Sequence, residues 1–371
     1  MKPIRVLHVF ASLDKGGAET MIMNIYRQID RQKLQFDFVV TDDGSRGAYE
    51  DEVLELGGRV LRVPKYTIRN LLTYKHAWVK LLDNYPEISI VHGHHTSPAY
   101  IYFRASKKMK RATIAHSHTA SGERTLKSYT KRLLRYLLVF KSDYLFACSK
   151  DAASWMFGKR SDKTYVVKNA IDLVAFAFNS EARESKRKEL EIGNRFVVGH
   201  IGRFDRVKNH EFLVDVFTKL KLTEPETVLL LVGDGALRGE IENNVKSRGL
   251  ADSVIFTGVR SDVPELLSAV DTFVLPSHFE GFPVSAVEAA ASGLPCIMSD
   301  TITNEACLTP QMVQVPIDKG AEPWVEKILT FKGTPRADNH DTLHEQGYDI
   351  SSTTAWLTNF YQDILETGEN K

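Results

Sequence analysis

Residues 272–298 read TFVLPSHFEGFPVSAVEAAASGLPCIM and contain one complete structural repeat. The apolar run 272–275 predicts a short strand, and a polar turn that contains Gly281 follows it. The small and apolar residues 284–291 predict a helix, and residues 296–298 predict a second strand. A strand, a crossover helix and a further strand in this order are typical of a parallel sheet covered by helices.

The same alternation extends along the whole chain. Strands rich in Val and Ile, without strict alternation of polar residues, are typical of parallel strands buried on both faces. The other predicted strands are 4–10, 36–40, 59–63, 88–92, 112–116, 144–147, 165–167, 196–201, 228–232 and 254–256, and the other predicted helices are 18–29, 48–56, 71–82, 210–220, 237–247 and 263–269. We therefore predict an α/β protein with two doubly wound, Rossmann-like parallel sheets.

A polar, charged stretch at 169–194 interrupts the alternation and predicts a domain boundary. We expect an N-terminal domain at 1–170, a C-terminal domain at 171–350 and a terminal helix at 351–371. The four-residue spacing of Trp356, Phe360 and Ile364 predicts that this helix packs back through an apolar face, onto the N-terminal domain.

Charge divides the chain into two unlike halves. Residues 1–168 contain 29 Lys or Arg and 16 Asp or Glu, whereas residues 169–371 contain 19 Lys or Arg and 31 Asp or Glu. The net charge of +1 for the whole chain therefore combines a basic first half with an acidic second half. A basic half could face nucleic acid, an anionic membrane or a phosphorylated ligand, although no nucleic-acid module is recognisable. Its basic segments are Arg104, Lys107, Lys108, Lys110 and Arg111, and then Arg124, Lys127, Lys131, Arg132, Arg135 and Lys141 interleaved with leucines.

The sequence favours a cytoplasmic protein. No apolar run approaches the roughly 18 residues that span a bilayer, and the apolar residues 4–10 predict a buried first strand rather than a signal peptide. The three cysteines, Cys148, Cys296 and Cys307, lack metal spacing and predict no disulfide framework. Contact of the second basic segment with the inner face of the membrane is an additional expectation.

Polar residues that follow predicted strands are the candidates for function, because open parallel sheets bind ligands at the carboxyl ends of their strands. Arg203 and Lys208 follow the strand 196–201, and two such cations suit a diphosphate. Glu280 follows the strand 272–275, and Glu288 lies eight residues later on a helix, where a carboxylate can accept hydrogen bonds from a ribose diol. A surface location for both glutamates is the alternative.

Two further groups follow strands of the first half. Gly16 and Gly17 lead into a helix whose amides could approach an anion, although the segment matches neither a dinucleotide fingerprint nor a P-loop. His92, His94, His95, His116 and His118 end two successive strands, whereas His8 lies inside a strand and is expected to be a core histidine. We expect ligand contacts from the five, with ordinary structural histidines as the alternative, and no metal, because no carboxylate or Cys accompanies them at a standard spacing.

These motifs together resemble the retaining glycosyltransferases of family 4, which have the two-domain GT-B fold and use nucleotide sugars. The resemblance is carried by GGAE at 16–19, GRFDRVKN at 202–209, LLLVGDG at 229–235, FTGVRSDVPELLSAVD at 256–271 and LPSHFEGFPVSAVEAAASGLP at 275–295. The opening residues resemble the bacterial exopolysaccharide and capsule branch of the family.

The resemblance implies a role for each matching residue. Arg203 and Lys208 would neutralise the donor diphosphate, Glu280 would face the transferred sugar, and Glu288 would hold the ribose hydroxyls. His118 would lie beside the donor sugar, with His116 as the alternative. The expected donor-contacting residues are Gly16, Gly17, Gly202, Gly258, Val259, Arg260, Phe282, Pro283 and Val284.

The resemblance also implies a reaction. A hexose or N-acetylhexosamine would pass from a nucleotide sugar, with UDP as the expected nucleotide, to a polyprenyl-diphosphate-linked glycan, and no other cofactor is expected. The alternatives are a nucleotide-sugar epimerase, which needs no acceptor, and a non-catalytic assembly subunit. The sequence does not identify the sugar, the linkage or the oligomeric state.

Overall fold

The computed structural model of the chain describes residues 3–14, 16–94, 98–118 and 142–368. The chain forms two compact units, one comprising Met1–Asn169 with Ile350–Lys371 and the other Ala170–Asp349. We call them the first unit and the second unit and describe each by itself. Among the described residues, no helix combines the length and the apolar character needed to cross a bilayer.

The first unit is a seven-stranded sheet in the order β3-β2-β1-β4-β5-β6-β7, and every pairing is parallel. Its strands are β1 (Ile4–Val9), β2 (Leu34–Asp42), β3 (Val60–Pro64), β4 (Ile88–Gly93), β5 (Ala112–Ser117), β6 (Tyr144–Ala147) and β7 (Tyr165–Val166). Its helices are α1 (Gly17–Gln28), α2 (Glu50–Glu55), α3 (Leu71–Asn84), α4 (Ala99–Lys108), α6 (Lys150–Phe157) and α14 (Ile350–Gly368), with 3-10 turns at Ile68–Asn70 and Gly158–Lys163.

The second unit is a six-stranded parallel sheet in the order β10-β9-β8-β11-β12-β13. Its strands are β8 (Val197–Ile201), β9 (Val228–Val232), β10 (Val254–Gly258), β11 (Thr272–Leu275), β12 (Cys296–Ser299) and β13 (Met312–Val315). Its helices are α7 (Ser180–Glu189), α8 (His210–Thr223), α9 (Arg238–Ser247), α10 (Val263–Ala269), α11 (Val284–Ala291), α12 (Glu322–Phe331) and α13 (His340–Glu345), with 3-10 turns at Ala251–Ser253 and Asn304–Ala306.

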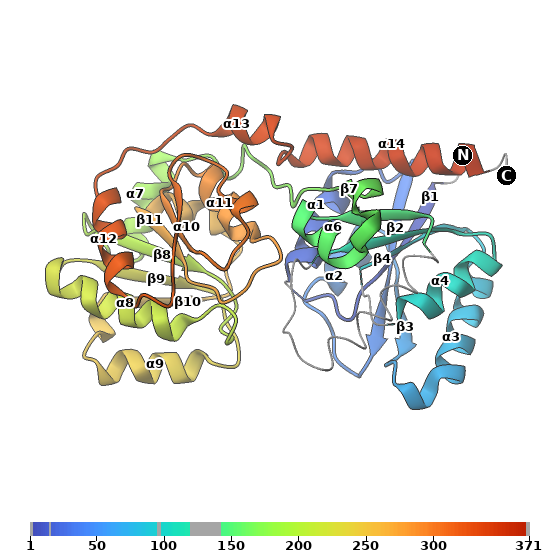
Figure 1. The fold of residues 1–371 in the computed structure, drawn as a ribbon, viewed down its shortest axis with the longest axis horizontal. Helices are drawn as coiled ribbons and strands as arrows, with labels where there is room; N and C mark the ends of the chain where they lie inside the picture. The colour runs from blue at the N-terminus through green and yellow to red at the C-terminus, as the bar shows by residue number, and fades with distance from the viewer. Residues whose placement is uncertain (1–2, 15, 95–97, 119–141, 369–371) are drawn as a thin grey trace. The chain divides into compact units, whose positions relative to one another are not determined.

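Helices cover both faces of each sheet (Figure 1). In the second unit, α8 contacts α9 and α12, whereas α10 contacts α7 and α11. In the first unit, α1 contacts α14 and α3 contacts α4. These arrangements confirm the predicted fold class of two doubly wound parallel sheets.

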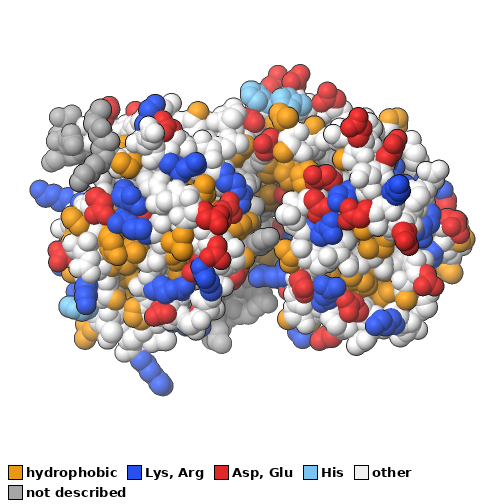
Figure 2. All heavy atoms as spheres, turned by 180° about the vertical axis from the view of Figure 1, so that it is seen from behind, with side chains coloured by type: hydrophobic (Ala, Val, Ile, Leu, Met, Phe, Trp, Pro, Cys, Tyr) orange, Lys and Arg blue, Asp and Glu red, His pale blue; other side chains and the backbone are white. Residues whose placement is uncertain are grey.

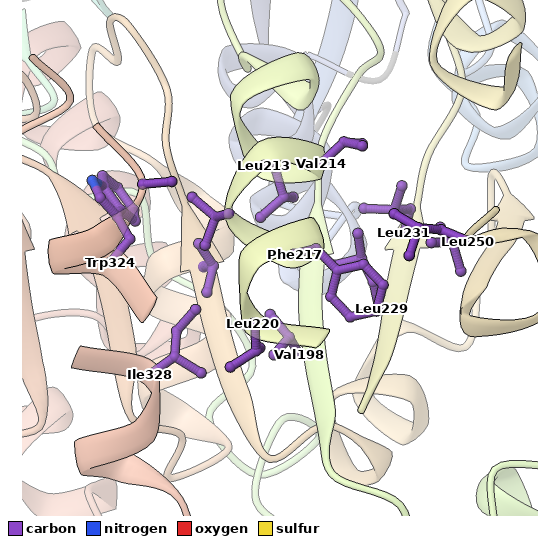
Figure 3. Packing of buried hydrophobic residues seen from close by; sticks show 14 of the residues in the cluster. Val198, Leu213, Val214, Phe217, Leu220, Leu229, Leu231, Leu250, Trp324 and Ile328 are labelled. Carbon is purple, nitrogen blue, oxygen red and sulfur yellow. The ribbon is translucent and has the colours of Figure 1, made fainter. Parts of the chain in front are cut away.

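The core of the second unit shows why these elements form. Every residue of β9 is buried, because the strand lies inside the sheet and is covered by helices on both faces. The apolar face of α8 packs over β8 and β9 through Leu213, Phe217 and Leu220, and Trp324 of α12 joins the same cluster (Figure 3). The 3.6-residue period of α8 therefore meets the buried surface of the central strands.

The charged stretch 169–194 is not only a connection, as the sequence suggested, because residues Ser180–Glu189 of it form helix α7. The side chain of Asn179 accepts a hydrogen bond from the backbone N–H of Ala182 and caps this helix at 2.9 Å. Arg187 is the one buried side chain of α7, so the helix lacks the apolar stripe by which helices are recognised in a sequence.

Candidate functional site

In the second unit, the order of the strands reverses direction between β8 and β11. After β8 the chain adds β9 and β10 on one side, and after β10 it returns to add β11, β12 and β13 on the other. The loops that follow β8 and β11 therefore leave the sheet in different directions at its carboxyl edge. This is the position at which open α/β sheets bind ligands.

The loop after β8 is held by its neighbours. The backbone N–H of Gly202 donates to the Val232 carbonyl at 3.0 Å, and that of Phe204 donates to the Asp234 carbonyl at 2.9 Å. A Cβ on Gly233, whose φ is +136°, would lie 2.1 Å from the Gly202 carbonyl oxygen. The close approach of these two loops therefore requires glycine at position 233.

An aspartate turn then presents the two predicted cations. The Asp205 carboxylate accepts hydrogen bonds from the backbone N–H groups of Val207 and Lys208 at 3.0 and 3.1 Å. The side chain of Arg203 is 74% exposed, and its Nε lies 3.0 Å from Asp205 Oδ2. Arg203 is thus open to a ligand on a loop whose backbone is fixed.

Lys208 and Glu280 meet across the two loops. Lys208 Nζ donates to Glu280 Oε1 at 2.6 Å, and the Ser277 hydroxyl donates to the same oxygen at 2.7 Å. The backbone also joins here, because the N–H of His278 donates to the Val207 carbonyl at 2.8 Å. The structure therefore brings together two residues that are 72 positions apart in the chain and were predicted to share one site.

Glu288 lies within helix α11, half-buried. Burial raises the pKa of its carboxyl group to about 7, and the charge of Lys208 opposes that rise. Helix α11 begins at Val284, after the buried residues Phe282 and Pro283, and no side chain caps its first turn. The ring of Phe282 stacks on Tyr348 at a centroid distance of 5.7 Å, so the start of α11 is fixed by packing.

The predicted base-contacting segment lies at the end of β10. Gly258 adopts a φ of +72°, and its carbonyl accepts a hydrogen bond from the N–H of Gly233 at 2.9 Å. Val259 is 57% exposed. Arg260 forms ion pairs with Asp262 at 2.6 Å and Glu189 at 3.0 Å. Among the described residues, Arg260 makes no hydrogen bond or ion pair with Lys208 or Glu280.

Three residues that sequence reasoning missed complete this edge. Ser277 holds Glu280, the hydroxyl of Thr301 donates to the Ser277 carbonyl at 2.9 Å, and Asn209 adopts a left-handed conformation and donates to the Pro276 carbonyl at 3.2 Å. The aspartate three positions before Lys208 was a readable signal for the turn. The contacts of Ser277 and Thr301 depend on the fold and had no local signal.

The first unit carries its polar residues at the carboxyl edge as well. Helix α1 begins at Gly17 after the cap residue Gly16, and no side chain caps it. His8, His92, His94, His116 and His118 form a hydrogen-bonded group that we call the histidine ladder. His95 and the basic residues from Arg124 to Lys141 lie outside the described residues, as does Lys15.

The histidine ladder consists of two chains. In one, His94 bonds to His118 at 2.8 Å and to His8 at 3.0 Å. In the other, His92 bonds to His116 at 3.1 Å and to the hydroxyl of Tyr361, on α14, at 2.7 Å. His8 is buried, as expected, but it belongs to the ladder and is not an isolated core residue.

The ladder is uncharged at neutral pH. Burial lowers the pKa of His8 and of His118 to about 3 and holds the pKa values of His92, His94 and His116 well below their usual range. A neutral imidazole donates through one nitrogen and accepts through the other, so each chain has one direction of donation. Nδ1 of His118 and Nε2 of His116 are buried and have no hydrogen-bond partner among the described residues.

The ladder also contains the described residues that could hold a metal ion. The groups His8, His92, His94 and His94, His116, His118 each offer three nitrogens within 4.8 Å of one another. In the structure, nitrogens of these groups bond to each other. The expectation of a metal-free site stays a prediction.

Family descriptions match both halves of the chain. "Glycosyltransferase Family 4" matches residues 15–174, and "Glycosyl transferases group 1" matches residues 181–339. The chain is 35% identical over 380 aligned positions to EpsF of Bacillus subtilis (strain 168), a protein named as a glycosyltransferase, with 99% of this chain and 98% of EpsF covered.

More distant relatives carry fuller descriptions. The chain is 26% identical to an Escherichia coli UDP-Gal:alpha-D-GlcNAc-diphosphoundecaprenol alpha-1,3-galactosyltransferase, over 82% of this chain and 81% of that protein. The structure of this chain resembles that of Anabaena Alr3699/HepE in complex with UDP-glucose, with a TM-score of 0.80 and 21% sequence identity. The comparison covers 97% of this chain and 99% of the Anabaena chain.

Proposed function

The chain belongs to the family 4 glycosyltransferases, with the GT-B fold, and on that premise we propose that it transfers a hexose or N-acetylhexosamine from a UDP-sugar to a lipid-linked glycan, with retention at the anomeric carbon. The pathway that we propose is the synthesis of an exopolysaccharide or capsule. The observation that carries the proposal is the meeting of Lys208 and Glu280 beside exposed Arg203 at the carboxyl edge of the second sheet.

Positive charge at this edge suits a departing nucleoside diphosphate. As the bond between the anomeric carbon and the phosphate oxygen breaks, negative charge grows on the diphosphate and positive charge grows on the sugar. The ammonium of Lys208 and the guanidinium of Arg203 would stabilise the former. Fixed charges of this kind typically contribute about 2.7–4 kcal/mol each to lowering a barrier.

Glu280 has two roles in this proposal. Its Oε1 holds the Lys208 ammonium in place, and its carboxylate would accept hydrogen bonds from hydroxyls of the transferred sugar. Glu288 would accept from the ribose, while Gly202, Gly258, Val259, Arg260, Phe282, Pro283 and Val284 would surround the nucleotide and diphosphate. Gly16, Gly17 and His118, in the first unit, would contact the diphosphate and the sugar.

Gly202 has a packing reason to be glycine in such a site. A Cβ at this position would lie 2.9 Å from His200 Nε2 and 3.2 Å from Lys208 Cδ. His200 itself is fixed, because its Nδ1–H donates to the Val274 carbonyl at 2.8 Å. Any larger residue at position 202 would displace the aliphatic stem of Lys208.

The acceptor is the less constrained half of the proposal. The E. coli relative acts on a diphosphoundecaprenol-linked sugar by its name, and the basic first half of this chain has the charge to meet a diphosphate lipid. Residues 56–82 contain six Lys or Arg and no Asp or Glu. Within them, α3 exposes Leu71, Leu72 and Val79 beside Lys75 and Lys80, so peripheral contact with an anionic membrane is part of the proposal.

The test is release of UDP from UDP-sugars in the presence and absence of a polyprenyl-diphosphate-linked glycan. We expect release that requires the acceptor, and we expect Arg203→Gln to lower kcat by about 100-fold, the usual effect of removing one such charge-stabilising donor. Arg206→Gln, an exposed arginine on the same loop, is the matched control and should retain activity.

Two outcomes would contradict the proposal. Full turnover in a folded Arg203→Gln protein would remove the assigned diphosphate contact. Conversion of the UDP-sugar into an isomer without acceptor would instead favour the epimerase alternative, and binding without either reaction would favour an assembly subunit.

A further inference from the structure

A cavity of about 550 Å³ opens in the second unit at the amino ends of the strands, whereas the site described above lies at their carboxyl ends. Phe196, Thr227 and Asp271, which line it, directly precede β8, β9 and β11, so the cavity lies at the amino ends of these strands. Helix α7, the loop between α8 and β9, and the loop after α12 supply the other walls. Its size is in the range of small-molecule sites, which is roughly 300–1,000 Å³.

The lining is rich in cations. Five positively charged side chains line the cavity against three carboxylates; the cations are Arg183, Arg187, Arg195, Lys332 and Arg336, and the carboxylates are Glu224, Glu226 and Asp271. The half of the chain that contains this cavity has an excess of acidic residues. The cavity therefore has a local excess of two positive charges in a half of the chain whose net charge is negative.

Three of the five cations have carboxylate partners. Arg183 and Arg187 share Asp271 at 2.5 and 2.6 Å, and Lys332 lies 2.6 Å from Glu224. Arg195 and Arg336 form no ion pair with any carboxylate of the described residues. Two guanidinium groups at this cavity thus have no carboxylate at ion-pair distance among the described residues, although Asp271 acts on Arg336 from farther away.

The contacts of Arg336 orient its guanidinium and occupy both Nη atoms. Its Nη atoms donate to the carbonyls of Ser292, Leu267, Ser268 and Val270, close to the carboxyl end of α10. Burial and the neighbouring charge of Arg183 lower the pKa of Arg336 to about 9. The charge of Asp271 opposes this lowering only in part, so a bound anion would further stabilise the charged guanidinium.

The guanidinium of Arg195 is held locally. Its Nε donates to the Ile192 carbonyl at 2.9 Å, and its Nη2 donates to the Glu191 carbonyl at 2.6 Å. These contacts lie within four residues of Arg195 and leave the rest of the guanidinium free of described partners. Arg195 can therefore be changed with little effect on the packing of α7 and α10.

We propose that this cavity binds a phosphate-bearing metabolite of monosaccharide size, whose phosphate is held by Arg195 and Arg336. The fork of Arg195 matches phosphate oxygens, whereas Arg336, whose Nη atoms already donate to protein oxygens, adds its Nε–H and its charge. A phosphate monoester carries about −1.5 to −2 charges at pH 7, which balances the excess of two. The site is separate from the donor site, because it lies at the opposite edge of the same sheet. The proposal does not depend on the identity of the transferred sugar.

The test uses Arg203→Gln protein, so that the proposed diphosphate contact at the other edge is weakened. Inorganic phosphate and glucose 1-phosphate are titrated by calorimetry, and the melting temperature is followed in parallel. We expect saturable binding of one equivalent and a rise in melting temperature. Adding Arg195→Gln should weaken binding about tenfold or more, and adding Arg336→Gln should do the same, since a hydrogen bond to a charged group contributes about 1.5–3 kcal/mol.

Arg248→Gln, an exposed arginine of the same unit, is the matched control and should bind as the parent does. Arg336→Gln could lower stability through the lost carbonyl contacts, so Arg195→Gln is the decisive variant. The proposal is overturned if the parent binds neither anion, if Arg195→Gln binds as tightly as the parent, or if the binding of wild-type protein disappears in Arg203→Gln alone.

Discussion

At the carboxyl edge of the second sheet, specific hydrogen bonds and ion pairs hold charged side chains in fixed positions. Lys208 is fixed by a turn on Asp205 and by Glu280, whereas Arg203 on the same loop is exposed. The half-buried Glu288 has a strongly raised pKa and so reports on this environment. Groups with such shifts are often found at functional sites.

The raised pKa of Glu288 predicts a pH dependence of stability. Its value of about 7 exceeds the ordinary 4.5, so the folded protein favours the protonated carboxyl. The contribution to stability is complete below about pH 4.5 and is lost as the pH rises through about 7. Glu288→Gln cannot ionise, and its melting temperature relative to wild type should therefore rise between pH 5 and pH 8.

Thermal unfolding monitored by circular dichroism at several pH values measures this difference. Glu240→Gln, on the exposed surface of α9, is the control and should follow wild type throughout. If Glu288→Gln and wild type keep a constant separation from pH 5 to pH 8, the carboxyl group does not titrate in this range.

At the scale of elements, loops and helices are held by few but specific contacts. The loop after β9 approaches the loop after β8 so closely that Gly233 has no space for a side chain. Helix α14 lies along the first unit (Figure 1), and Tyr361 attaches it to the histidine ladder. Both contacts predict effects that can be measured on stability.

Gly233→Ala should destabilise the protein by about 2 kcal/mol or more, because a Cβ would collide with a backbone carbonyl and the φ of +136° is strained for alanine. Gly239→Ala is a matched control. A Cβ there meets nothing within 4 Å, and alanine favours helix α9, so we expect a gain of up to about 1 kcal/mol. Urea unfolding compares the two; equal effects would contradict the predicted collision.

Tyr361→Phe should cost about 1–3 kcal/mol, because the buried Nδ1 of His92 would lose its partner. Chemical denaturation measures the loss. Tyr165→Phe, which changes a ring that is 44% exposed, should have little effect. Unchanged stability in Tyr361→Phe would show that the hydrogen bond adds nothing to the attachment of α14.

Particular elements show what a sequence can predict and what it cannot. Strands such as β9 and helices such as α11 were located to the residue, because their apolar period is strong. Helix α7 was missed because one buried arginine replaces an apolar stripe. The positions of Lys208 and Glu280 after two strands predicted that both lie at one end of the sheet. Their direct pairing was not predicted, because residues distant in the chain meet according to strand order.

At the scale of the whole molecule, the described basic residues do not gather into one patch on the face shown in Figure 2. In Figure 2, the described Lys and Arg side chains lie among Asp and Glu on that face. A membrane-facing surface would instead combine cations with exposed apolar side chains. Helix α3, with Leu72 at 79% exposure, meets this description.

The full chain should therefore bind vesicles that contain anionic lipid, and binding should weaken as salt is raised. Lys75→Glu with Lys80→Glu should reduce the bound fraction in a sedimentation assay, because each basic residue contributes about 1 kcal/mol near such a surface. Lys246→Glu, exposed in the second unit, is the control. Equal binding of all three proteins would place any membrane contact elsewhere, including residues 124–141.

The route of the chain has a consequence for biosynthesis. The first unit includes both Met1–Asn169 and α14, whose Tyr361 hydroxyl bonds to His92. When residue 169 has been translated, the first unit therefore still lacks α14. The whole second unit must be translated before that helix is made. The first unit to emerge is therefore completed only at the end of synthesis, and a nascent chain truncated before residue 350 would leave His92 of β4 without its Tyr361 partner.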